Sequence, residues 1–326
     1  MDIGKKIGLQ YGPATRDAFG ETLRDLGGEN ENIVVIDGDV NNSTRTEFFA
    51  EKYPQRFFNL GIAESNMVST GSGMAAAGKD VIVSSFAVFL IDNAYDQIRM
   101  GIAFPHLPVR LVGSHSGISI GEDGPSQMSI EDLALTTALP GFTVLVPADA
   151  PSTKALTRAM FELDGPSFLR TGRSKCAVVY PDGADFKIGK ANQLRDGKDL
   201  TIIACGLMVA AALEAAADLE AEGIQSRVLD MHTVKPLDEE AIEQAARETG
   251  AIVTAEEHLL EGGLGAGVAR VVSMWNPVPM GFVGIHNTYA ESGKPEELFE
   301  KFGLMPEDIV RVAKETVNKK SANLRG

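Results

Sequence analysis

Short, continuous runs of Val, Ile and Leu recur along the chain, separated by longer segments in which apolar residues repeat every three to four positions. Continuous apolar runs are typical of strands that are buried on both faces, as in parallel sheets covered by helices. The candidate strands are residues 33–36, 81–86, 109–112, 143–147 and 168–171, followed by 200–205, 226–231, 251–255 and 281–285. The pattern therefore predicts an α/β protein with mainly parallel sheets flanked by helices.

Segments of helical period lie between these runs. The candidate helices are residues 15–26, 63–77, 90–103, 152–163, 208–222, 239–249 and 306–318. Ser152 and Asp238 stand at natural N-cap positions, and Gly223 and Gly250 follow helices as residues that can close them. The polar stretch 319–326 is predicted to fray.

A domain boundary is predicted where the two sets of strands are separated. Residues 172–199 are rich in turn residues and show little periodicity. We therefore expect a first domain over residues 1–180, a linker over 181–198 and a second domain over 199–326. A chain of 326 residues is long enough for two domains of ordinary size.

Composition argues against several classes of function. The formal net charge is −15 with no basic cluster, so we expect no nucleic-acid partner. No apolar run is long enough to span a membrane, and no apolar segment follows the N-terminal lysines, so we expect neither a membrane segment nor a secretory signal. The two cysteines and five histidines show no disulfide or metal-site spacing, which indicates a reducing cytoplasm and no metal site in this chain.

One acidic side chain stands out in residues 57–67, which have the pattern of a strand end, a turn and the first turn of a helix. Glu64 is surrounded there by apolar and small residues. It is either a charge at a helix N-terminus or a group directed at a ligand. Arg16, Arg99 and Arg170 also lie near predicted element ends, where each could form a surface ion pair or hold an anion.

A polar, glycine-rich loop over residues 112–127 follows a predicted strand and combines His115, Glu122 and Asp123 with several hydroxyls. Loops at the carboxyl ends of parallel strands carry the sites of α/β proteins. The glycine patterns at 71–76 and 263–268 lack either the context or the third glycine of a dinucleotide fingerprint. The first pattern instead indicates a closely packed helix, and the second indicates a tight turn at the start of a helix.

Several motifs occur in an order that resembles the transketolase family. In the first domain they are residues 60–67 (LGIAESNM), 85–89 (SFAVF), 114–115 (SH), 121–126 (GEDGPS), 147–149 (PAD) and 168–173 (FLRTGR). In the second domain they are residues 233–238 (TVKPLD), 256–258 (EEH), 262–265 (GGLG), 291–293 (ESG) and 302–304 (FGL). The resemblance covers nearly the whole chain and implies a pyrimidine-binding domain followed by a transketolase C-terminal domain.

The resemblance implies thiamine-diphosphate-dependent transfer of a two-carbon ketol unit from a ketose phosphate to an aldose phosphate. Glu64 would hydrogen-bond N1′ of the cofactor's aminopyrimidine and so promote deprotonation at C2 of its thiazolium. Phe86 and Phe89 would wall the pyrimidine ring. His115 would contact the reacting sugar oxygens, and Asp123 would bind a donor hydroxyl. A carboxyl in a dry, apolar pocket suits the role given to Glu64, because its hydrogen bond is strong there.

The resemblance also assigns Arg16, Ser43 and Arg170 to the sugar phosphate, which arginine forks bind well. Two positions depart from the family. Gln127 stands where a substrate-binding histidine is expected, and Asp92 stands where full-length transketolases carry an aromatic residue in the cofactor pocket. Gln127 can donate and accept a hydrogen bond but cannot carry a proton near neutral pH. The sugar pair is therefore left open.

Transketolases hold the cofactor's diphosphate and Mg²⁺ through a Gly-Asp-Gly…Asn motif in a separate domain. No Gly-Asp-Gly occurs in this sequence, in which Gly38 and Asp39 are followed by Val40. We therefore expect the C-terminal-half subunit of a split transketolase, active only with an N-terminal subunit that binds the diphosphate and Mg²⁺. An α₂β₂ heterotetramer is the expected assembly.

Three other interpretations stay open. The β subunit of a 2-oxo acid dehydrogenase E1 has the same architecture but differs in the loop 121–126. A deoxyxylulose-phosphate synthase fragment shares the pattern 262–265. A non-catalytic regulatory paralogue would have no need of Glu64 and His115, whose presence argues against it.

Overall fold

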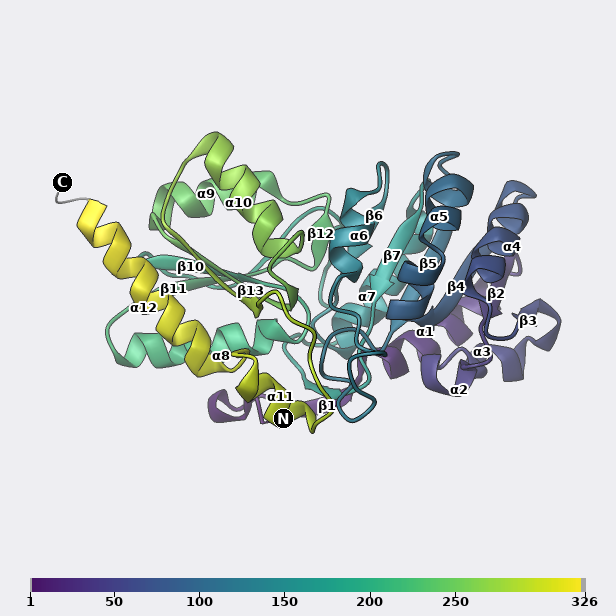
Figure 1. Ribbon diagram of the computed structural model, residues 1–326, viewed down its shortest axis with the longest axis horizontal. Coiled ribbons are helices and arrows are strands. Elements are labelled where there is room, and N and C mark those ends of the chain that lie inside the picture. Colours follow the sequence, from purple (N-terminus) through teal and green to yellow (C-terminus); the bar gives the residue numbers. More distant parts are fainter. Residues whose placement is uncertain (1, 324–326) are drawn as a thin grey trace.

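The computed structural model describes residues 2–323 as two α/β lobes that lie side by side (Figure 1). The first lobe is built on a seven-stranded sheet that is parallel except for β12. In spatial order its strands are β12 (Thr233–Lys235), β6 (Thr143–Leu145), β7 (Ser167–Arg170), β5 (Val109–Ser114), β4 (Asp80–Phe86), β2 (Ile33–Asp37) and β3 (Phe57–Asn59). The predicted fold class is thus confirmed.

Helices cover both faces of this sheet, as the continuous apolar runs predict. Val34 and Ile36 of β2 pack in one core with Met67 of α4 (Glu64–Ala76). Their neighbours in sequence point the other way, where Val35 packs with Phe19 of α1 (Thr15–Glu29). The other helices of the lobe are α2 (Asn41–Thr44), α3 (Glu47–Lys52), α6 (Asp132–Ala138) and α7 (Ala150–Ala159), with 3₁₀ turns η2 (Pro54–Arg56) and η5 (Met160–Glu162). A further 3₁₀ turn, η1 (Lys5–Ile7), packs against the second lobe.

The helix predicted over residues 90–103 is interrupted. It consists of a π-helical turn η3 (Phe89–Asn93), a short α5 (Tyr95–Gln97) and a second π-helical stretch η4 (Ile98–Ala103). The wider turns bring the adjacent side chains Leu90 and Ile91 into the core together. An apolar period near 3.6 could not distinguish these turns from a regular helix.

The second lobe contains a five-stranded sheet that is parallel except for β9. Its strands are β14 (Met280–Ile285), β13 (Ile252–Leu259), β10 (Leu200–Ala204), β11 (Ser226–Asp230) and β9 (Asn192–Arg195). Its helices are α8 (Met208–Ala221), α9 (Glu239–Thr249), α10 (Leu264–Trp275), α11 (Pro295–Lys301) and α12 (Pro306–Asn323). Strand β9 lies within the segment that was predicted as a linker. No helix among residues 2–323 has the length and apolar character needed to cross a membrane.

Two helix ends differ from their predicted positions. Asp149, not Ser152, caps α7, because Ser152 is the third helical residue and returns a hydrogen bond in a capping box. Asp238 does cap α9, and Gly250 ends it with a φ of 63°. Helix α12 continues to Asn323, so fraying was wrongly predicted for residues 319–323, and 324–326 lie outside the described residues.

The two lobes share a sheet and a core. Strand β12 follows β11 in sequence but pairs with β6 at the edge of the first lobe's sheet (Figure 1). Lys235 at its end donates hydrogen bonds to the carbonyls of Thr137 and Leu139. A two-stranded sheet of β1 (Tyr11–Ala14) and β8 (Lys175–Ala177) completes the fold. Strand β12 has only three residues and therefore no measurable period, so the sequence could not predict its pairing with β6.

Candidate active site

Glu64 is the first residue of α4 and lies against the carboxyl end of β4. Its side chain is buried, at 6% exposure, and its Oε1 accepts a hydrogen bond of 3.0 Å from the hydroxyl of Ser85. No described residue hydrogen-bonds to its second carboxylate oxygen. A charge that served the helix dipole alone would be expected in solvent, because that interaction contributes only about 0.3–1 kcal/mol. The burial therefore favours a group directed at a ligand.

Two phenylalanines extend the site from Ser85. Phe86 ends β4 and is paired in register with Ser114 of β5, which places it beside the next residue, His115. Its ring stacks on the His115 imidazole with centroids 3.9 Å apart and planes 13° apart. Phe89 lies nearly parallel to Phe86, at 6.1 Å and 15°. Both phenylalanines are half-buried, so they offer aromatic surface to a ligand.

His115 is held in one orientation and one tautomer. Its backbone has a φ of 59°, which is uncommon for a residue other than glycine and is found where the surrounding structure enforces it. Arg16 Nη1 lies 3.1 Å from Nε2 of His115. A guanidinium can only donate, so Nε2 must accept and Nδ1 must carry the proton, which it donates to the Ser114 hydroxyl.

The surroundings of His115 also keep it neutral. Burial, and after it the positive charges of Arg16, Arg173 and Arg45, together lower its pKa to about 3. Because the pKa in the folded protein lies below the ordinary value of 6.5, the neutral form contributes stability that is fully present above about pH 6.5. That contribution is lost progressively as the pH falls from about 6.5 through about 3.

We therefore expect His115 to stay neutral between about pH 5 and pH 8 and to carry its proton on Nδ1. Nitrogen-15 NMR of histidine-labelled protein at about pH 5.5 would show this tautomer, with exposed His286 as the reference resonance. Titration of His115 near its ordinary pKa would contradict the packing and the hydrogen bonds described above.

Arg16 provides a cationic group with unused hydrogen-bonding capacity. Its Nη1 also donates to the backbone carbonyl of Ser43 at 2.9 Å, which brings that predicted residue to the same place. Its Nε is buried and has no hydrogen-bond partner within the described part of the chain. A buried guanidinium N–H without an acceptor suggests that a ligand supplies one.

Arg170 is not part of the group formed by Arg16, His115 and Phe86. Its guanidinium forms a buried ion pair with Asp132, at 2.8 Å, and donates to the carbonyls of Ser129 and Glu257. The predicted contact of Arg170 with a sugar phosphate is therefore not supported. Arg173, three residues further along, was missed although it lies in the same motif, and its charge reaches His115.

The remaining predicted residues lie on the rim. Asp123 and Arg173 form an ion pair of 3.4 Å. Gln127 is half-buried in the same loop and accepts a hydrogen bond from the Ser126 hydroxyl. Asp92, on η3, is exposed, yet partial loss of water around its carboxyl and, after it, the charges of Glu131 and Asp132 together raise its pKa to about 7.

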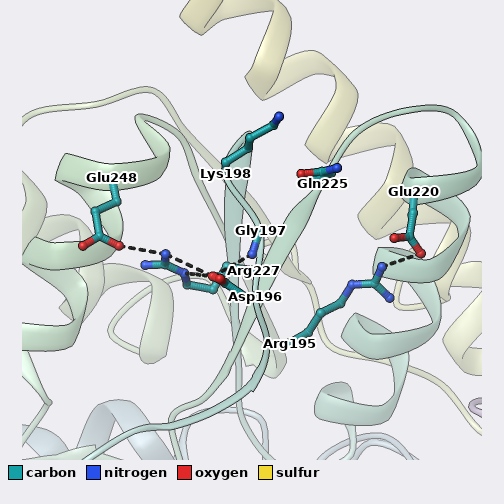
Figure 2. A pocket seen from close by; sticks show the side chains of 8 residues that line it. All are labelled: Arg195, Asp196, Gly197, Lys198, Glu220, Gln225, Arg227 and Glu248. Carbon is teal, nitrogen blue, oxygen red and sulfur yellow. Dashed lines mark hydrogen bonds and ion pairs between the residues drawn. The ribbon is translucent and has the colours of Figure 1, made fainter.

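A cavity of about 490 Å³ in the second lobe is a poor candidate for catalysis (Figure 2). It lies at the amino ends of β10 and β11, whereas α/β proteins bind ligands beyond the carboxyl ends. Figure 2 shows both of its arginines paired with carboxylates: Arg195 with Glu220, and Arg227 with two acids. The cluster around Glu64 and His115 is therefore the candidate site.

Comparison with known proteins identifies the family of both halves of the chain. The family model "Transketolase, pyrimidine binding domain" matches residues 12–178, and "Transketolase, C-terminal domain" matches residues 189–309. A putative transketolase C-terminal section from Methanocaldococcus jannaschii is 41% identical over 308 residues, covering 93% of this chain and 96% of that protein. The family resemblance inferred from the motifs is thus confirmed.

Two further relatives also match over at least 95% of their length. The 6-deoxy-6-sulfo-D-fructose transketolase subunit SqwH from Clostridium sp. is 38% identical over 306 residues, covering 94% of this chain and 95% of that protein. A solved structure described as a split gene transketolase, inactive beta4 tetramer, aligns with a TM-score of 0.89 and 45% identity. The alignment covers 95% of this chain and 100% of that one.

Proposed function

The chain belongs to the transketolase family, and we propose that it is the C-terminal-half subunit of a two-chain, thiamine-diphosphate-dependent transketolase. The observation that carries the proposal is one connected cluster that runs from Glu64 through Ser85, Phe86 and His115 to Arg16. It combines a buried carboxyl, an aromatic surface and a cationic end. Ketol transfer between anionic sugars requires each of these features.

The residues fit the aminopyrimidine end of thiamine diphosphate. Glu64 offers a carboxylate oxygen to a ring nitrogen, and Phe86 and Phe89 offer aromatic surface to a planar ring. When bound, the cofactor supplies a carbon nucleophile and an electron sink. Glu64 would hold a proton at the ring nitrogen, in a setting from which most water is excluded and the hydrogen bond is correspondingly strong.

His115, Arg16 and Arg173 would receive the sugar. Nε2 of the neutral imidazole would accept a hydrogen bond from a sugar hydroxyl in place of Arg16 Nη1, without attracting the anionic group to the reacting carbon. Arg16 has a buried N–H without a hydrogen-bond partner among the described residues, and Arg173 is half-exposed on the rim. Arg16 and Arg173, together with the backbone around Ser43, would form a site for the terminal phosphate of the sugar, which arginine binds in a fork geometry.

The partner subunit would bind the other end of the cofactor. The sequence contains no Gly-Asp-Gly motif for the diphosphate and Mg²⁺, and two relatives that match from end to end are described as a section and a subunit. We therefore assign the diphosphate and Mg²⁺ to an N-terminal subunit, in an α₂β₂ assembly. The donor would be a ketose with an anionic terminal group, and Gln127 and Asp92 are the positions at which its identity would be read.

Replacement of two neighbouring arginines would test the substrate side of this proposal. Arg173→Met is expected to raise the KM for a phosphorylated donor at least about tenfold, because a charge-assisted hydrogen bond contributes about 1.5–3 kcal/mol. Arg170→Met would instead leave Asp132 buried without its partner and lower the free energy of unfolding by about 3–5 kcal/mol.

Steady-state kinetics and thermal melting of both variants, in the complex with the N-terminal subunit, separate these effects. A raised KM in a stable Arg170→Met complex, together with a normal KM in Arg173→Met, would reverse the assignment. Arg99→Met provides the matched control, because Arg99 is exposed and contacts only Met100 among the hydrogen-bonding partners described.

A further inference from the structure

The loop that carries His115 is anchored in the second lobe. We call residues 114–130, which connect β5 to the start of α6, the site loop. Four apolar side chains of the site loop, Ile118, Ile120, Met128 and Ile130, are almost fully buried in a core with residues of the second lobe such as Met208. The second lobe is therefore part of the platform on which the candidate site is built.

One side chain of the second lobe binds the site loop directly. Glu257, near the carboxyl end of β13, is 4% exposed, and its Oε1 accepts a hydrogen bond of 2.6 Å from the backbone N–H of Ser119. Its carboxyl also lies so close to Gly117 that any Cβ at that position would collide with it. Gly117 has a φ of 77°, which glycine adopts without strain.

The contact of Glu257 is opposed by contacts from the first lobe, so the loop is held on both sides. The carbonyl of Ser119 accepts a hydrogen bond of 2.8 Å from the hydroxyl of Ser174. Arg170 donates at 3.0 Å both to the carbonyl of Glu257 and to that of Ser129 at the far end of the loop. The backbone between His115 and Ser119 thus has little freedom to relax.

Burying Glu257 is costly, which indicates a role other than stability. Burial raises its pKa to about 7, against the opposing charge of Arg170. Its contribution to stability is therefore present below about pH 4.5 and is lost as the pH rises through about 7. An apolar residue would pack there at lower cost but would give Ser119 no acceptor.

We propose that Glu257 is a positioning residue of the active site, which fixes the backbone at Gly117 and Ser119 and thereby holds His115 in its left-handed conformation against Phe86. The proposal rests on the function proposed above for His115. It assigns to the second lobe a part in setting the geometry of the reaction, although none of its side chains belongs to the cluster around Glu64.

The test compares three variants in the complex with the N-terminal subunit. Glu257→Met removes the acceptor at similar volume, and Glu257→Gln retains an amide oxygen that can accept from Ser119. Glu256→Met is the matched control, because Glu256 is equally buried in β13 but accepts from Leu264 and Gly265 of α10 instead of from the site loop. Ketol-transfer kinetics with fructose 6-phosphate and ribose 5-phosphate, and amide hydrogen exchange of residues 116–123, are measured for each.

We expect Glu257→Met to lower kcat at least about tenfold while the KM for the donor changes less than about threefold, because misplacement acts on the reacting groups. Exchange in residues 116–123 should accelerate at least about tenfold. Glu257→Gln should stay within about threefold of the wild type in both measurements, and Glu256→Met should alter neither.

Three results would overturn the proposal. They are a normal kcat in Glu257→Met, an equal loss of kcat in Glu256→Met, and a loss in Glu257→Gln as large as in Glu257→Met. If Glu257→Met does not fold, a tenfold loss of kcat in Glu257→Gln, which keeps the acceptor for Ser119, would still overturn the proposal. If the wild-type complex transfers no ketol unit from any phosphorylated ketose, the proposed function fails, while hydrogen exchange still tests the contact of Glu257 with the site loop.

Discussion

The purified chain alone is expected to show no ketol transfer with thiamine diphosphate and Mg²⁺, and to gain activity when it is co-expressed with the N-terminal subunit. The cluster around Glu64 can bind the pyrimidine end of the cofactor, but the sequence lacks the motif that holds the diphosphate. A cofactor held at one end does not keep its reactive carbon in place, and small misplacements cost about 100-fold in rate. The difference between the chain and the complex should be at least that large.

This expectation is measured by purifying the chain alone and as a complex, then assaying both with the same donor and acceptor sugars. Size-exclusion chromatography reports whether the two subunits form an α₂β₂ assembly. A complex that contains Glu64→Gln, prepared in parallel, controls for contaminating transketolase from the expression host. Turnover by the single chain above that background would contradict the two-chain proposal.

The second large effect is expected from Glu64→Gln in the assembled complex. We expect kcat to fall at least about 100-fold, the scale of general acid–base catalysis by one positioned group. The amide has nearly the shape of the carboxyl and can still accept from Ser85, so assembly should survive. It cannot exchange a proton with the cofactor ring, and that loss is what the assay detects.

A second helix-end glutamate separates this role from a simple charge effect. Glu307 lies in the first turn of α12 and is exposed, so Glu307→Gln removes only a charge near a helix N-terminus. Its complex should keep full activity. Near-normal ketol transfer by Glu64→Gln, or an equal loss in Glu307→Gln, would remove Glu64 from its assigned role.

The parts of the fold that the sequence predicted are those whose signal is local. The strands β2, β4 and β10 each contain a run of buried β-branched and aliphatic residues, and their position between amphipathic helices indicated a parallel sheet. The pairing of β12 with the other lobe's sheet depends on tertiary contacts across about 90 residues of chain. No local pattern encodes such a pairing.

The sequence predicted those residues of the candidate site that lie in recognisable motifs. Glu64, Phe86 and His115 lie in motifs that could be recognised, and the structure brings them together. Arg170 and Arg173 belong to one motif, and only the end of β7 decides which of them faces Asp132 and which lies near His115. Side-chain direction at a strand end cannot be read from spacing alone.

Glu257 illustrates a different limit. Its motif contributed to the recognition of the family, but nothing in the sequence indicated that its carboxyl would reach a loop of the other lobe. The contact joins residues separated by 138 positions. Functions that depend on such long-range contacts become visible only when the packing of the two lobes is known.

In the proposed mechanism, Glu64 activates a cofactor that is held between two chains. Exchange of the C2 proton of bound thiamine diphosphate with deuterium, followed by NMR after acid quench, measures this activation without any sugar. We expect the wild-type complex to exchange at least about 100-fold faster than the Glu64→Gln complex, with cofactor bound in both. Equal exchange rates in the two complexes would contradict the account.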